Sequence, residues 1–241
     1  MASATIIKIS KQDKISKNLL SYHEIKTVKF KRIRGRCDEA IRLCNLLDES
    51  IKRLSENLKE KDRHHVLTSE ELGKAQKSIA YGCIKYTDLS HHQNSDYVFS
   101  FDRMLDDRGN TVAYLLYTYT RIRSIVRIAD VDHNILTAIA CDIDLNFEIE
   151  ECELKLVKCI VKYSDVFTRV LGELSMHDLC DFMYQLAIMF NDFYDRCYYV
   201  EKDIITREVQ INYRRILLSE VIANVLKQCF EVLGIQPLEQ M

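Results

Sequence analysis

The chain has 241 residues, enough for one large domain or two small ones whose core needs no disulfides. Its 34 Lys and Arg against 36 Asp and Glu give a formal net charge of −2, which excludes a polycation and confines any nucleic-acid-binding surface to a local patch. One Pro and six Gly favour helices and weigh against an all-β sandwich.

Cysteine usage and hydropathy indicate the compartment. The nine cysteines include no C-x-x-C pair and the amino terminus has no secretory pattern, so we expect reduced thiols in a cytoplasmic protein. No segment approaches about 18 uninterrupted apolar residues. We therefore expect a soluble protein that does not contact a membrane.

The amino-terminal part is a weakly patterned lead-in, with a short strand expected at residues 6–9. Apolar and basic residues then alternate, which predicts a basic strand or loop over residues 26–36. Its cations include Lys29, Lys31, Arg32 and Arg34. Two interpretations stay open, a solvated strand edge protected by lysines and a loop that contacts phosphates.

The remainder predicts a mostly all-α protein, because apolar residues recur every three or four positions. The expected helices cover residues 38–61, 68–86, 109–127, 134–163, 175–193 and 213–233. A break is expected near residues 142–146, and a hairpin-like or loop excursion over residues 201–209. Gly234 marks the end of the last helix.

The segment 109–127 is central. Asn110 or Thr111 can cap its start. One stripe at helical spacing contains Tyr114, Tyr117, Arg121 and Ser124, and a second contains Leu115, Tyr119, Ile122 and Val126. Spacing alone favours a helix buried on two sides. The alternative is that the first stripe binds unpaired RNA bases, which stack on tyrosine rings beside a guanidinium.

Several kinds of chemistry have no matching motif. The six glycines form neither G-x-G-x-x-G nor a P-loop, which weighs against a self-contained nucleotide enzyme. The adjacent pairs His64-His65 and His91-His92 point apart on a helix, so no metal site is expected. His177 and Cys180 are interpreted as structural residues.

A resemblance to a known family rests on spaced matches over about 210 residues. The matching motifs are Gly82-Cys-Ile-Lys-Tyr86, Asp96-Tyr-Val-Phe99, Gly109-Asn-Thr-Val-Ala-Tyr114, Arg121-Ile-Arg-Ser-Ile125, Leu179-Cys-Asp181, Phe193-Tyr-Asp195, Glu201-Lys-Asp203 and Leu233-Gly-Ile-Gln-Pro-Leu-Glu-Gln-Met241. The chain resembles arginyl-tRNA synthetase, and the eukaryotic cytosolic form in particular. Residues 1–27 lie outside the resemblance.

The resemblance implies a class I synthetase architecture, of which this chain has the second half. Residues 28–62 correspond to the end of the catalytic domain, 63–108 to a helical connecting region, and 109–241 to an all-helical anticodon-binding domain of the DALR type. The parent reaction ligates arginine to tRNA(Arg) with ATP and Mg²⁺. Since no HIGH-type motif is present, we expect neither catalytic residues nor a cofactor in this chain.

The resemblance also implies the RNA-binding residues. They are Asn110, Tyr114, Tyr117, Arg121, Tyr194, Tyr198 and Met241. The expected partner is tRNA(Arg), through its anticodon loop and stem, with Lys29, Lys31, Arg32 and Arg34 as candidate phosphate contacts. The alternative is a non-catalytic helical module that docks on a full-length synthetase or a multi-synthetase assembly. Whether the sequence is a truncated product or part of a longer ligase stays open.

Overall fold

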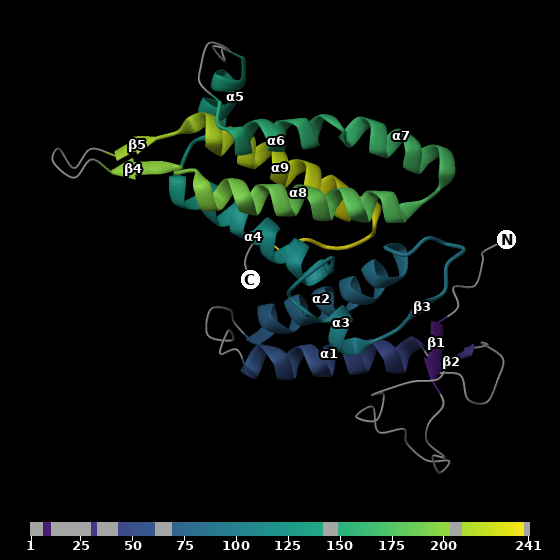
Figure 1. The fold of residues 1–241 in the computed structure, drawn as a ribbon. Coiled ribbons are helices and arrows are strands. Elements are labelled where there is room, and N and C mark those ends of the chain that lie inside the picture. Colours follow the sequence, from purple (N-terminus) through teal and green to yellow (C-terminus); the bar gives the residue numbers. More distant parts are fainter. Residues whose placement is uncertain are drawn as a thin grey trace.

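The computed structural model describes residues 7–10, 30–32, 43–60, 69–141, 149–202 and 209–238. This part of the chain is mostly helical, which confirms the predicted fold class. Figure 1 shows two stacked parts, a lower one with α1, α2, α3 and a small sheet, and an upper bundle that contains α4 to α9. No described helix is long and apolar enough to cross a membrane.

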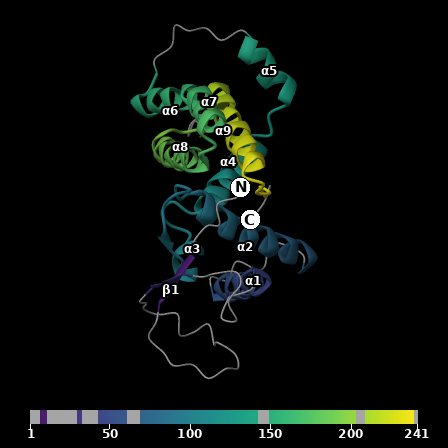
Figure 2. The same ribbon diagram turned by 90° about the vertical axis from the view of Figure 1, so that its right-hand side faces the viewer.

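The lower part is organised around two helices that pack side by side (Figure 2). They are α1 (Leu43–Glu60) and α2 (Ser69–Leu89), followed by the short α3 (Phe101–Met104). One face of α2 is apolar and buried, since Ile79, Cys83 and Tyr86 are each at most 2% exposed. The predicted start of this helix, residue 68, lies outside the described residues.

Three short strands form a small sheet beside these helices. They are β1 (Ile7–Ser10), β2 (Phe30–Arg32) and β3 (Tyr97–Val98). β1 lies in the middle, antiparallel to β2 with Ile9 opposite Lys31, and parallel to β3 with Ile7 opposite Tyr97. The predicted lead-in strand and basic strand are therefore both present, and they pair with each other.

Helix α4 (Val112–Ala129) connects the two parts, packing against α2, α8 and α9. Thr111 caps it, because its Oγ1 accepts a hydrogen bond from the Tyr114 backbone N–H at 3.3 Å. The helix ends at Asp130, which has a left-handed backbone conformation. Of the two predicted stripes, the second is core, since Leu115, Tyr119 and Ile122 are at most 2% exposed.

The segment after α4 contains one more helix than the sequence predicts. It forms α5 (His133–Cys141), α6 (Glu151–Val161) and α7 (Tyr163–Glu173), and the expected break falls on residues 142–148, which are outside the described part. The predicted pattern ends at residue 163, close to the end of α6, but α7, which begins there, was not predicted. Neither Pro nor Gly marks the interruption at Lys162 between these two helices, so composition does not indicate it.

The upper bundle is completed by α8 (Met176–Arg196) and α9 (Tyr213–Val232). Ser175 stands at the N-cap position of α8, but its hydroxyl contacts His177 Nδ1 at 2.5 Å and makes no capping bond. Between these helices, β4 (Val200–Lys202) and β5 (Val209–Ile211) pair antiparallel. The predicted hairpin-like excursion is thus a hairpin.

The residues after α9 return to α2. Gly234 has a φ of 63°, which ends the helix and turns the chain. The backbone carbonyl of Gly234 accepts a hydrogen bond from Lys85 Nζ at 2.5 Å, and that of Gln236 accepts one from the Ser78 hydroxyl at 3.1 Å. Since Ile235 is also buried, this tail fastens the lower part to the upper bundle.

Candidate nucleic-acid interface

The centre of the candidate site is the side chain of Arg121, which lies between two tyrosine rings. Its guanidinium carbon is 4.9 Å from the ring centroid of Tyr117, one turn earlier on α4, and 4.9 Å from that of Tyr194 on α8. Arg121 Nη2 also donates a hydrogen bond to the Tyr117 hydroxyl at 3.1 Å. The attraction between a cation and aromatic faces therefore holds α4 and α8 together at this point.

Asn191 on α8 lies beside this cluster and joins it by three hydrogen bonds. Its Oδ1 accepts one from Arg121 Nη1 at 2.8 Å. Its Nδ2 lies 2.7 Å from the Tyr114 hydroxyl and 3.3 Å from the Thr118 hydroxyl, to which it donates. Sequence reasoning missed Asn191. The available signal was its position three residues before Tyr194, on the same side of a long helix.

The tyrosines differ in how much of each ring faces solvent. Tyr114 is half-buried, with its ring edge against Tyr184 at a centroid distance of 5.7 Å. Tyr117 is 40% exposed, Tyr194 38% and Tyr198 73%. Because an unpaired base stacks on any accessible aromatic face, these three exposed rings can receive bases, whereas the half-buried Tyr114 accepts a hydrogen bond from Asn191.

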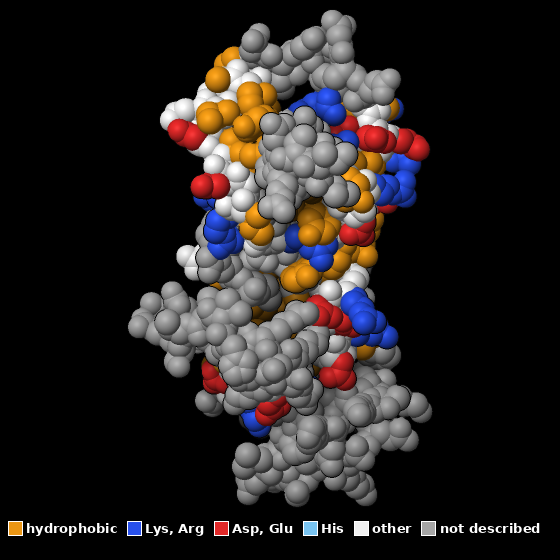
Figure 3. Space-filling view, turned by 90° about the vertical axis from the view of Figure 1, so that its left-hand side faces the viewer, with side chains coloured by type: hydrophobic (Ala, Val, Ile, Leu, Met, Phe, Trp, Pro, Cys, Tyr) orange, Lys and Arg blue, Asp and Glu red, His pale blue; other side chains and the backbone are white. Residues whose placement is uncertain are grey.

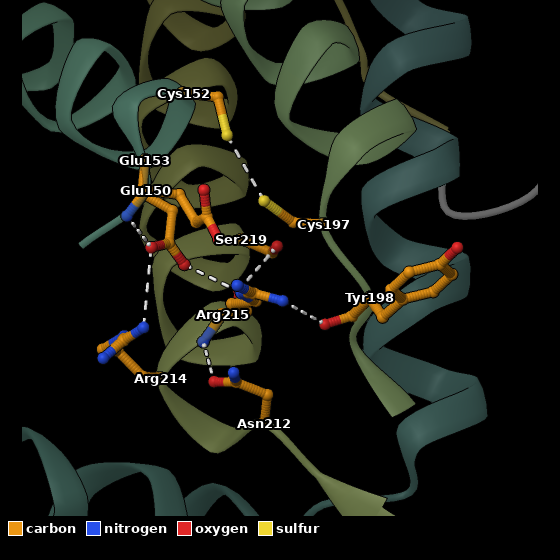
Figure 4. A network of polar contacts seen from close by, with 9 residues as sticks. All are labelled: Glu150, Cys152, Glu153, Cys197, Tyr198, Asn212, Arg214, Arg215 and Ser219. Atoms are coloured by element: carbon orange, nitrogen blue, oxygen red, sulfur yellow. Dashed lines mark hydrogen bonds and ion pairs between the residues drawn. The ribbon is translucent and has the colours of Figure 1, made fainter. Parts of the chain in front are cut away.

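Tyr198 reaches the surface from the root of the hairpin, where a network of charged residues holds its backbone (Figure 4). Arg215 on α9 donates from Nη1 to the Tyr198 carbonyl at 2.8 Å and from Nε to Glu153 Oε1 at 2.8 Å. Arg214 forms a longer ion pair with Glu153 at 3.5 Å. This network ties α6, α9 and the start of β4 to one another, and no sequence motif indicated it.

Glu153 is the buried member of that network, with 2% of its residue surface exposed. Burial alone raises the pKa of its carboxyl, but the hydrogen bonds from Arg215 and from the Glu150 backbone N–H, together with the charges of Arg214 and Arg215, bring the pKa below its usual range. Glu153 is therefore a carboxylate at neutral pH, and its charge is balanced by the two arginines.

Asn110 makes its hydrogen bonds outside the cluster around Arg121. Its Oδ1 accepts a hydrogen bond from the Tyr86 hydroxyl at 2.6 Å, and its Nδ2 donates to Asp181 Oδ1 at 3.2 Å. Burial and the nearby Cys180 and Asp181 raise the pKa of Tyr86, so its phenol stays protonated and able to donate. Asn110 thus joins α2 to α8, and its side chain is exposed as well.

The remaining predicted residues lie elsewhere or outside the described part. Lys29, Arg34 and Met241 are outside it, and Lys31 and Arg32 are described only as backbone of β2. In Figure 1, β2 is in the lower part, whereas the hairpin is in the upper bundle. The structure therefore brings together Tyr114, Tyr117, Arg121 and Tyr194, but it does not bring the basic strand to them.

The surface around the hairpin is mixed in character. On the face shown in Figure 3, hydrophobic side chains lie next to Lys and Arg side chains. Within the described residues, no group of three or more His, Cys, Asp or Glu side chains could hold a metal ion. The side chains around Arg121 offer stacking, hydrogen bonding and charge attraction.

Two models of known protein families match segments of this chain. Residues 115–241, which begin in α4 and include the cluster around Arg121, match the DALR anticodon binding domain, and residues 18–101 match the catalytic domain of class I (R) tRNA synthetases. The chain belongs to the arginyl-tRNA synthetase family. The aromatic cluster accordingly lies within the part that matches an anticodon-binding model.

Relatives from animals are similar over most of this chain. It is 50% identical to the cytoplasmic arginine–tRNA ligase of Bos taurus and 49% identical to that of Homo sapiens, over 212 residues that cover 88% of this chain and 32% of each relative. The chain thus spans about a third of the length of these ligases. The arginyl-tRNA synthetase of Plasmodium falciparum superposes with a TM-score of 0.70 at 31% identity, over 83% of this chain and 34% of that one.

Proposed function

We propose that this chain is the tRNA(Arg)-binding, carboxyl-terminal part of an arginyl-tRNA synthetase. The observation that carries the proposal is the Arg121 guanidinium between the rings of Tyr117 and Tyr194, within the segment that matches the DALR anticodon-binding model. Such a surface offers two partly exposed rings for unpaired bases and a cation for the adjacent phosphate. We propose the anticodon loop and stem as the bound region.

Tyr198 is proposed as a further contact with the RNA. Its ring is the most exposed of the three, and its carbonyl is held by Arg215, so the ring extends from a fixed backbone position. Met241 is proposed as a further contact. Each stacked base contributes about 1 to 3 kcal/mol. With an overall charge of −2, we expect binding that weakens with salt and is modest in affinity.

The parent reaction is proposed for the whole protein and not for this chain alone. Relatives named as cytoplasmic arginine–tRNA ligases are about three times as long, and we propose that the whole protein ligates arginine to tRNA(Arg) with ATP in the cytoplasm. We expect the present chain to bind tRNA without forming arginyl-tRNA. An aminoacylation assay that detects arginyl-tRNA with this chain alone would contradict the expectation.

Binding of arginine tRNA and of a second tRNA to the full chain tests the proposal. Tyr117→Ala removes one ring from the Arg121 cluster, and Tyr117→Phe is its matched control because it keeps the ring and removes only the hydroxyl. We expect wild type to prefer arginine tRNA, Tyr117→Ala to lose most of the affinity, and Tyr117→Phe to retain most of it. Equal binding by wild type and Tyr117→Ala would exclude this surface.

A second candidate function is docking on a full-length synthetase or a synthetase assembly. Large apolar side chains are exposed near the ends of α6 and α7, with Val161 at 70%, Leu171 at 65% and Leu174 at 71%. Such side chains can contribute to a protein interface. A pull-down that survives ribonuclease and high salt would favour docking, whereas loss of the partner under either treatment would favour RNA binding.

A further inference from the structure

Two thiols from distant parts of the chain meet beneath the root of the hairpin. Cys152 lies in the first turn of α6 and Cys197 directly follows α8, and their Sγ atoms are 3.3 Å apart (Figure 4). Both are free thiols and both residues are buried, at 5% and 6% exposure. Among the described cysteines, no other two thiols are joined by a hydrogen bond.

We propose that Cys152 and Cys197 form a reversible intramolecular disulfide when the protein meets a hydroperoxide. A disulfide holds its sulfur atoms about 2.0 Å apart, so the two thiols need to approach by about 1.3 Å. Cys197 has an extended backbone conformation and lies outside α8, so it can move toward α6 without breaking the regular part of that helix. This proposal does not depend on RNA binding.

The chemistry balances with hydrogen peroxide as the two-electron oxidant. One thiol loses its proton and its sulfur attacks a peroxide oxygen, which breaks the O–O bond and gives a sulfenic acid and water. The second thiol then attacks the sulfenic sulfur, and the hydroxide that leaves takes up the proton of the second thiol as water. One S–S bond and two O–H bonds replace two S–H bonds and one O–O bond.

The reaction is expected to be slow. Burial and the hydrogen bond with Cys152 raise the pKa of the Cys197 thiol to about 12, so little thiolate is present at neutral pH. What distinguishes this pair is therefore the short distance between its two sulfur atoms. Cys229 is a comparison, because burial raises its pKa to about 12 as well, yet within the described part of the chain it has no hydrogen bond to another thiol.

Peptide mapping of the full chain tests the proposal. The protein is treated with hydrogen peroxide, denatured, alkylated and digested with trypsin without reduction. Cleavage after Arg127 and Lys155 places Cys152 in peptide 128–155, and cleavage after Arg196 and Lys202 places Cys197 in peptide 197–202. We expect these two peptides to be linked in the monomer and to separate on adding dithiothreitol, while Cys229 is alkylated.

Peptide 128–155 also contains Cys141, so variants assign the bond. Cys141→Ser should keep the linked peptides, whereas Cys152→Ser should abolish them. Fragment-ion sequencing of the linked wild-type peptides distinguishes Cys141 from Cys152, so the bond is assigned even if a variant folds poorly. The proposal is overturned if both thiols remain alkylatable after peroxide treatment, or if Cys197 is found linked to a cysteine other than Cys152.

Discussion

The side-chain oxygen of Asn191 accepts a hydrogen bond from Arg121 at 2.8 Å, across a separation of 70 residues. The same amide donates to the hydroxyls of Tyr114 and Thr118. One side chain on α8 thus fixes the positions of two candidate RNA-contacting residues on α4. A cluster that is already ordered in the free protein loses less side-chain entropy when a ligand binds.

Replacing Asn191 with Leu should destabilise the fold as well as the candidate interface. The change leaves the hydroxyls of Tyr114 and Thr118 without their shared partner, so we expect the free energy of unfolding to fall by about 1 to 3 kcal/mol. Urea denaturation followed by circular dichroism measures this. A variant as stable as wild type, with unchanged tRNA affinity, would show that Asn191 does not organise the cluster.

Arg121→Lys tests whether the planar guanidinium matters beyond its charge. Lysine keeps the positive charge but cannot lie flat between two rings while donating to Asn191 and Tyr117. We expect tRNA affinity to fall about tenfold, equivalent to about 1.4 kcal/mol. Arg169→Lys, on α7, is the charge-matched control and should bind as wild type does. Equal losses in both variants would indicate a general charge effect.

The buried carboxylate of Glu153 should make stability depend on pH. Its pKa is lower in the folded protein than in the unfolded chain. The contribution to stability is therefore complete above the ordinary carboxyl pKa of about 4, and it is lost as the pH falls through the folded pKa. We expect Glu153→Gln to lower the free energy of unfolding by about 1.5 to 3 kcal/mol at pH 7.

The gap between Glu153→Gln and wild type should shrink toward pH 3, because glutamine does not titrate. Urea unfolding at several pH values measures both curves. Glu151→Gln is the matched control on the same helix, since Glu151 is exposed and pairs with the exposed Lys155, so its loss should change stability little. A constant gap from pH 7 to pH 3 would contradict the assigned pKa direction.

Two glycines should respond in opposite ways to substitution with alanine. Gly234 has a left-handed backbone, so Gly234→Ala should destabilise the protein by about 1 kcal/mol or more. Gly73 lies inside α2 with open space around it, so Gly73→Ala should stabilise by about 0.5 to 1 kcal/mol. Thermal melting checks the signs, and a stabilising Gly234→Ala would disprove the role of that turn.

Periodicity predicted the helices and the core face of α4 well, because burial imposes a regular spacing on apolar residues. Leu115, Tyr119 and Ile122 are buried as that spacing predicts. Helix α7 was not predicted, and nothing in the composition marks the interruption at Lys162 that separates it from α6. Spacing alone also could not indicate that the first stripe of α4, which contains Tyr114 and Arg121, contacts α8 through Asn191.

The network of Glu153 and Arg215 illustrates a second reason why parts of the site stay hidden in a sequence. The two residues are 62 positions apart, and each is an ordinary charged residue on an amphipathic helix. Glu153 is buried only because the helices pack together in the folded protein. Tyr194 and Arg121 were identified separately by resemblance, but their contact through the face of the ring also required the structure.

The tail that returns from α9 to α2 has a consequence for biosynthesis. Lys85 and its partner Gly234 are separated by 149 residues. At about 5 to 20 residues per second, a ribosome needs on the order of 10 s to make the intervening chain. Throughout that interval Ile235 cannot cover the surface of α2 at Gly82. Nascent chains at this stage should therefore expose an apolar surface to which a chaperone can bind.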